Sequence, residues 1–70
     1  MVEFKAVLSS NIQGIGYDAD NQALYVEFTS GGQYRYDGVS EDEYDAFMGA
    51  GSKGSYFHNN IKDIYPATRV

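Results

Sequence analysis

The chain has 70 residues, with ten Asp and Glu, five Lys and Arg, and no cysteine. This composition excludes a disulfide framework and a thiolate metal site, and the longest apolar runs fall far short of the roughly 18 residues that a membrane-spanning helix needs. The net charge of −5 disfavours non-specific binding to nucleic acid, because the overall field repels phosphate.

The charges and the aromatic residues decide where a core and a partner are expected. Seven Tyr and four Phe must supply much of the core of this small single domain, since each ring buries a large area. Residues 1–51 carry nine acids and two bases, whereas residues 52–70 carry one acid and three bases, Lys53, Lys62 and Arg69. An anionic partner is therefore expected to meet the C-terminal part of the chain.

Residues 1–8 are predicted to form an N-terminal arm or a short strand, ahead of a domain over residues 9–70. The apolar residues of this segment alternate with other residues, at Val2, Phe4, Ala6 and Leu8. The segment lacks the apolar stretch of a secretory signal, so a cytoplasmic location is expected. A Ser-Ser-Asn turn at residues 9–11 follows, because such side chains bond nearby backbone amides.

Residues 12–18 are predicted to form the first strand of a meander. Ile12, Gly14 and Gly16 fall on one side of it, and Gln13, Ile15 and Tyr17 fall on the other. We expect Ile15 and Tyr17 to face the core. The two glycines carry no side chain, so they permit a bulge or the close approach of another backbone, with a ligand as a further alternative.

A hairpin over residues 23–38 is the strongest local prediction. Polar and apolar residues alternate in residues 23–29 and 33–37, and a Ser-Gly-Gly turn separates the two runs. Tyr34 and Tyr36 share a side and are expected to pack into the core with Leu24, Val26 and Phe28, the alternative being that they stack on bases. Tyr25 and Arg35 then lie on the open face, where they are the better pair for stacking.

Two helices are predicted after the hairpin. Ser40 and Glu43 form a capping box, Tyr44, Phe47 and Met48 form an apolar stripe, and residues 49–51 end the first helix with Gly51 at the C′ position.

The second helix opens at residues 52–55 and continues through Tyr56, Phe57, Asn60, Ile61 and Ile64 at helical spacing. Pro66 stops it, and residues 65–70 are expected to be a C-terminal strand or a draped tail. The predicted fold is therefore α+β, a three-stranded antiparallel β-meander with two short α-helices packed on one face and an extra terminal strand as an option.

Several short motifs occur together and resemble the KTSC domain family. They are Ser9-Ser10-Asn11-Ile12, Ile15-Gly16-Tyr17-Asp18, Tyr34 and Tyr36 around Arg35, and Ser52-Lys53-Gly54 followed by Tyr56-Phe57 and Ile61. The resemblance spans roughly residues 9–70. This family is named for the C-terminus of some lysyl-tRNA synthetases, and it also occurs as small stand-alone proteins of bacteria and phages.

The resemblance implies a small non-catalytic module that binds RNA, tRNA included. Its expected contacts are the basic groups, the Lys-Gly-Ser segment and one aromatic ring, namely Tyr25, Arg35, Lys53, Gly54, Ser55, Lys62 and Arg69. The net charge motivates an alternative, an acidic interaction module that docks on a larger bacterial or phage protein through a sheet edge or the acidic helix face.

The Lys53-Gly54-Ser55 segment has two interpretations. It is either a plain helix start or a place where free amides and one ammonium hold an anion, although its order differs from that of a phosphate-binding Walker loop. His58 is expected to be a surface or capping histidine, because no partner for metal binding or catalysis lies at recognisable spacing. We therefore predict no enzyme activity, no metal and no cofactor.

Overall fold

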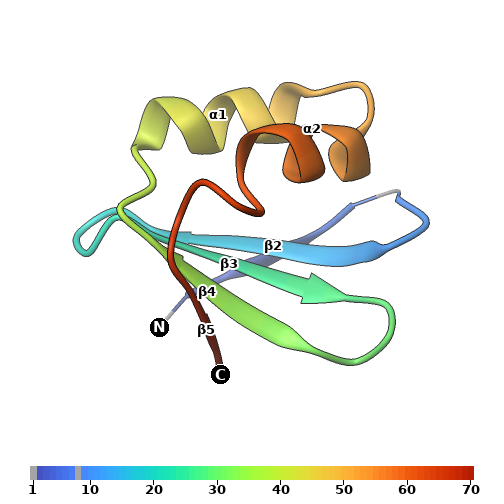
Figure 1. Cartoon of the computed structure of the whole chain (residues 1–70), viewed down its shortest axis with the longest axis horizontal. Coiled ribbons are helices and arrows are strands. Elements are labelled where there is room, and N and C mark those ends of the chain that lie inside the picture. The colour runs from blue at the N-terminus through green and yellow to red at the C-terminus, as the bar shows by residue number, and fades with distance from the viewer. Residues whose placement is uncertain (1, 8) are drawn as a thin grey trace.

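The chain folds into a five-stranded antiparallel sheet with two helices on one face (Figure 1). This computed structural model describes residues 2–7 and 9–70; Leu8, expected to continue the alternation of the N-terminal arm, lies outside the described residues. The strands follow one another in space as they do in sequence. The elements are β1 (Phe4–Ala6), β2 (Ile12–Asp18), β3 (Ala23–Phe28), β4 (Gln33–Asp37), α1 (Glu41–Gly49), α2 (Lys53–Asn60) and β5 (Ala67–Arg69).

The α+β class and the two helices on one face are confirmed, but the three-stranded meander is wrong. The sheet gains β1, which pairs with β2, and β5, which pairs with β4. Each of these outer strands has three residues, too few for alternation to distinguish a strand from an arm or a tail. Their pairing is decided by neighbours distant in sequence.

Gly16 shows why β1 can lie so close to β2. A Cβ atom at this position would stand 2.5 Å from Cγ1 of Val2 and 3.1 Å from the carbonyl oxygen of Glu3. The space that a side chain would need is therefore filled by the two residues that lead into β1. The prediction that a glycine here permits the close approach of another backbone is confirmed.

A bulge in β2 changes which isoleucines face the core. The register between β2 and β3 shifts between Ile12 and Gly14, and the extra residue, Gln13, is exposed. Ile12 and Ile15 are both fully buried as a result. The expectation that they lie on opposite sides of the strand is wrong, because a bulge breaks strict alternation.

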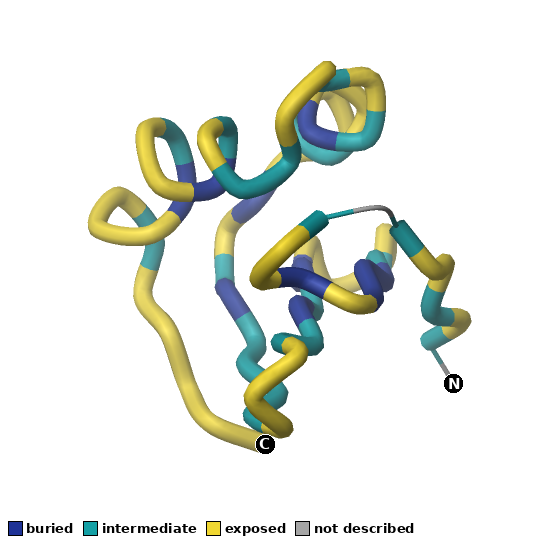
Figure 2. The backbone as a smooth tube through the Cα atoms, turned by 90° about the vertical axis from the view of Figure 1, so that its right-hand side faces the viewer, coloured by how far each residue is buried: buried dark blue, intermediate teal, exposed yellow. Residues whose placement is uncertain are grey.

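The core lies between the sheet and the helices, where Figure 2 shows the buried segments of both layers facing each other. Tyr36 is 4% exposed and packs edge-to-face against Phe57 of α2, so its predicted core position is confirmed. Tyr34 packs against the same core but stays half-buried. The fully buried large side chains are Phe47, Ile12, Ile15, Leu24, Ile61, Val26 and Val39.

Helix α1 begins as predicted. The hydroxyl of Ser40 accepts a hydrogen bond from the Glu43 amide at 3.2 Å, and Phe47 is fully buried on the helix face that Tyr44 and Met48 flank. Its end differs from the prediction, since the C-cap is Ala50 in an extended conformation and the left-handed glycines of the described chain are Gly31 and Gly38. The prediction that Gly51 is a left-handed C′ residue is therefore wrong.

Helix α2 is shorter than the predicted apolar spacing implies. Ser52 caps it by accepting from the Ser55 amide at 3.3 Å, and the last helical residue is Asn60. A tight turn follows, so Ile64 leaves the apolar stripe and is 62% exposed. No helix of the described residues is long and apolar enough to cross a bilayer.

One carboxylate ties the helices to the segment that leads into β5. Glu43 of α1 accepts a hydrogen bond from the hydroxyl of Tyr56 on α2, and a second from the hydroxyl of Tyr65 at 3.4 Å. The bond to Glu43 is the main reason why the pKa of Tyr56 is raised to about 12, since ionisation would place two negative charges side by side. Three segments are thereby held at one point.

Candidate ligand-binding grooves

The structure divides the predicted RNA-contacting residues between two faces. Tyr25 and Arg35 are opposite each other on β3 and β4, on the face that no helix covers (Figure 1). Lys53, Gly54 and Ser55 begin α2 on the other side of the sheet. The remaining two, Lys62 and Arg69, follow α2, with Arg69 opposite the helix-facing Tyr34. The seven residues do not form one surface.

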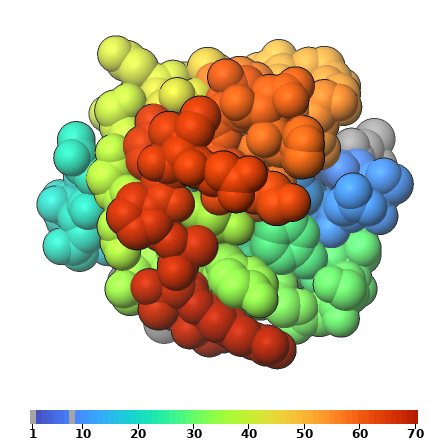
Figure 3. Space-filling view, viewed as in Figure 1, coloured from blue at the N-terminus to red at the C-terminus, as the bar shows by residue number. Residues whose placement is uncertain are grey.

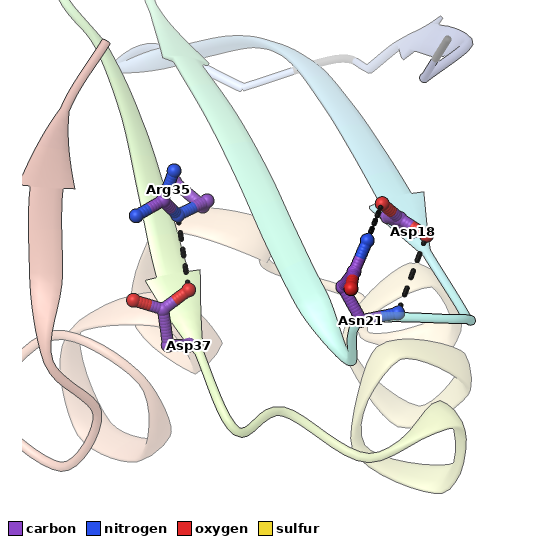
Figure 4. A network of polar contacts seen from close by, with 4 residues as sticks. All are labelled: Asp18, Asn21, Arg35 and Asp37. Carbon is purple, nitrogen blue, oxygen red and sulfur yellow. Dashed lines mark hydrogen bonds and ion pairs between the residues drawn. The ribbon is translucent and has the colours of Figure 1, made fainter.

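On the open face of the sheet, Arg35 already forms an ion pair with Asp37. Nε of Arg35 donates to Oδ1 of Asp37 at 3.0 Å, with about a third to a half of each side chain exposed (Figure 4). This hydrogen bond is the main cause of the raised pKa of Arg35. Tyr25 lies edge-on to Phe4, with ring centroids 6.1 Å apart. Because Asp37 pairs with Arg35, this face offers little free positive charge to a phosphate.

Carboxylates further disfavour a nucleic acid on that face. Asp18 accepts a hydrogen bond from Nδ2 of Asn21 at 2.8 Å, and this bond is the main reason why the pKa of Asp18 is lowered (Figure 4). Asp18 and Asp37 line one pocket with Arg35, and Glu27 lies on the same face, opposite Gly14 of β2. Negative charge thus dominates around Arg35.

A polar groove of about 520 Å³ lies on the helix side, where the turn before β2 meets the start of α2. The capping bond from Ser55 to Ser52 shapes its edge, and Nζ of Lys53 donates to the carbonyl oxygen of Ala50 at 2.7 Å. Hydroxyl and amide side chains dominate, and the described lining residues include no carboxylate. They are Ser9, Ser10, Asn11, Gly51, Ser52, Lys53, Gly54, Ser55, His58 and Asn59.

An aromatic groove of about 600 Å³ lies beside it, between α2 and the hairpin of β3 and β4. The aromatic rings of its floor pack edge-to-face. The ring centroid of Phe28 lies 5.9 Å from that of Tyr34 and 5.4 Å from that of Phe57. Figure 3 shows this side of the molecule, with the green hairpin between orange α2 and the red C-terminal strand. The other lining residues are Asn11, Ile12, Thr29, Ser30, Tyr36, Gly54, His58, Lys62, Asp63 and Ala67.

The two grooves adjoin and are locally cationic. They share the lining residues Asn11, Gly54 and His58. Together they contain Lys53 and Lys62, whereas Asp63 is the single carboxylate among their described lining residues. The other nine acids of the chain lie outside the grooves. These two grooves therefore carry less negative charge than the rest of the chain.

Sequence reasoning found part of this site and missed the rest. The Lys53-Gly54-Ser55 segment and Lys62 line the grooves, but residues 9–11 were expected only to form a turn. His58, expected to be a surface or capping histidine, is exposed in the last turn of α2 and lines both grooves. A signal for residues 9–11 was present, because they belong to the same set of resembling motifs as residues 52–54.

Comparison with known proteins places this arrangement in context. Residues 8–65 match the KTSC domain. A crystal structure of a KTSC domain protein from Yersinia pestis is 38% identical and superposes with a TM-score of 0.97, covering 100% of this chain and 99% of that one. An uncharacterized protein of Stutzerimonas stutzeri is 40% identical over 57 residues, 81% of this chain and 80% of its own. A protein of Tsukamurella paurometabola is 34% identical over 64 residues, 91% and 96% of the two chains.

Proposed function

Because the chain belongs to the KTSC domain family, we propose that it is a non-catalytic module that binds a single strand of RNA in the polar and aromatic grooves. The resemblance to the synthetase-associated family motivates the choice of RNA. The surface differs from the one predicted from sequence, because Tyr25 and Arg35 lie on the opposite face of the sheet and are left out. Lys53, Gly54, Ser55 and Lys62 are retained.

The observation that carries the proposal is the separation of charge. Two lysines line the grooves against a single carboxylate, in a chain whose net charge is −5. A concave surface with one sign of charge concentrates the opposite charge locally, even where the whole molecule has the same sign as its ligand. A polyanion would therefore meet least repulsion here.

The aromatic groove supports a single strand rather than a duplex. Phe28 and Tyr34 are half-buried, so each ring keeps an accessible part beside Lys62. Stacking of an unpaired base on such a ring contributes roughly 1–3 kcal/mol, and every base has a face that can stack. Bases within a duplex are already stacked on each other and could not use this floor.

Titration of labelled single-stranded RNA and tRNA at low salt tests the proposal. Lys53→Glu with Lys62→Glu should abolish binding, whereas Lys5→Glu with Arg35→Glu should weaken it far less, although both pairs change the net charge equally. With two lysines in contact, the logarithm of affinity should fall with the logarithm of salt with a slope of roughly −1.4. Absence of binding by the parent protein at high micromolar concentration would contradict the proposal.

A second candidate is an acidic surface that docks on a basic protein. Glu41 and Asp45 of α1 and Asp18 of β2 lie near Tyr17, where, after burial, their charges raise the pKa of its hydroxyl. Such a surface suits a cationic partner. If Glu41→Lys with Asp45→Lys abolishes capture of a host protein while Lys53→Glu with Lys62→Glu leaves it intact, this second function is correct and the RNA proposal is wrong.

A further inference from the structure

We infer that the smallest ligand of these grooves is one nucleotide, whose base lies in the aromatic groove and whose phosphate lies in the polar groove, with Gly54 forming the passage between them. This inference rests on the proposed function and adds to it the unit that is recognised. It predicts that a free nucleoside monophosphate binds without the rest of an RNA strand.

The fold does not explain why residue 54 is a glycine. It lies in the first turn of α2, where glycine is less favourable than alanine. Its φ is outside the left-handed range, and a Cβ atom would meet only Oγ of Ser9, at the ordinary contact distance of 3.6 Å. Neither backbone conformation nor crowding therefore requires glycine. Gly54 does line both grooves, so a side chain there would narrow their junction.

Each groove has room for one part of a nucleotide. Taken singly, the volumes of about 600 and 520 Å³ fall within the roughly 300–1,000 Å³ of pockets that bury small molecules. Since they share Asn11, Gly54 and His58, one molecule of nucleotide length can occupy both at once. The aromatic groove suits its planar apolar part.

The polar groove suits the phosphate. Lys53 uses one of its three ammonium donors on Ala50, which fixes the ammonium beside the groove and leaves two donors free of that bond. Ser9 and Ser10 add hydroxyl donors from the facing turn, and the described lining residues place no carboxylate against an anion. Lys62 and Asp63 line the aromatic groove, together with the rings.

Chemical-shift titrations with four probes test the inference: adenosine 5′-monophosphate, adenosine, inorganic phosphate and octa-adenylate RNA. We expect the monophosphate to shift amides around both grooves, adenosine only those of the aromatic groove, and phosphate only those of the polar groove. Tyr34→Leu should weaken the monophosphate and adenosine by roughly 5- to 150-fold, the loss of one stacking contact, and leave phosphate unchanged.

Substitution of Gly54 separates the passage from the two grooves. Gly54→Leu should weaken the monophosphate by at least about tenfold, while adenosine and phosphate still bind separately. Gly54→Ala is the smaller change that secures the test if the leucine variant folds poorly, and Gly49→Ala in α1 is the matched control. Equal binding of the monophosphate by parent and both Gly54 variants would overturn the inference.

The RNA probe distinguishes a failure of the single-nucleotide inference from a failure of the proposed function. If octa-adenylate shifts the groove amides but the monophosphate does not, the single-nucleotide inference is wrong and the proposed function stands. If neither probe binds, both are wrong. If the monophosphate shifts amides of the open sheet face around Arg35 instead, the site is misplaced and both proposals are overturned.

Discussion

Gly16→Ala should loosen the N-terminal strand. The new methyl group would stand 2.5 Å from Cγ1 of Val2 and 3.1 Å from the carbonyl oxygen of Glu3. The valine side chain can rotate away, but the carbonyl belongs to the backbone, so the chain that leads into β1 must move. Gly14→Ala is the matched control two residues away, because its nearest neighbour is Oε1 of Glu27 at 3.3 Å, the end of a flexible side chain.

The size of the effect is bounded from both sides. Adding a methyl group where the space is already filled costs about 1–3 kcal/mol, and 1 kcal/mol shifts the midpoint of a domain this small by about 4–8 °C. Detachment of β1 limits the cost, since Lys5 and Ala6 are exposed and Phe4 is half-buried. We therefore expect Tm to fall by roughly 5–20 °C, with the change at Gly14 within about 0.5 kcal/mol of neutral.

Thermal melts followed by circular dichroism, together with amide hydrogen exchange, measure both parts of this prediction. In Gly16→Ala the amides of β1 should lose protection while those of β3 keep it, because β3 lies at the centre of the sheet. A Gly16→Ala protein that melts with the parent and keeps β1 protected would refute the reasoning. So would equal losses for Gly14 and Gly16, since the contacts of the two positions differ in kind.

Three further outcomes are expected. Phe47→Ala, at a fully buried site, should cost about 3–5 kcal/mol, about the whole net stability of a domain this size, so a retained cooperative melt near the parental Tm would count against the described core. Gly54→Ala should raise Tm by a few degrees, since alanine favours a helix by up to about 1 kcal/mol, and a lower Tm would mean strain at this position. Absorbance titration should place the pKa of Tyr56 at about 12, and Glu43→Gln should return it towards its ordinary 10.0. Because the folded pKa is the higher one, the stability from this tyrosine is complete below pH 10.0 and is lost as the pH rises to about 12; a melting temperature that does not fall across this range would contradict the assignment.

Features set by neighbouring residues could be predicted from the sequence. The hydroxyl of Ser40 caps α1, and Gly31 adopts a φ of 103° in the hairpin turn, because each choice depends on a few adjacent residues. A bulge near Gly14 was one alternative from the sequence, but its position at Gln13 could not be predicted, since Ile12 and Ile15 are equally apolar. Their burial became evident only from the pairing of β2 with β3.

The candidate site was harder to predict than the fold, because its walls come from three separate parts of the chain. Residues 9–12, 28–36 and 51–67 meet only after the helices pack on the sheet. Lys53 illustrates the difficulty: its charge was evident, but its bond to the carbonyl oxygen of Ala50 depends on the extended C-cap of α1. Spacing along the chain carried no information about that bond.

The shared carboxylate of Glu43 has a consequence for the speed of binding. It fixes α2 through Tyr56 and the segment before β5 through Tyr65, and these two elements border the aromatic groove. A groove with fixed walls has no closing step that could limit the rate of association. The observed rate should therefore rise in proportion to ligand concentration without reaching a plateau, whereas in Glu43→Ala, where both tyrosines are released, a slower unimolecular step should appear.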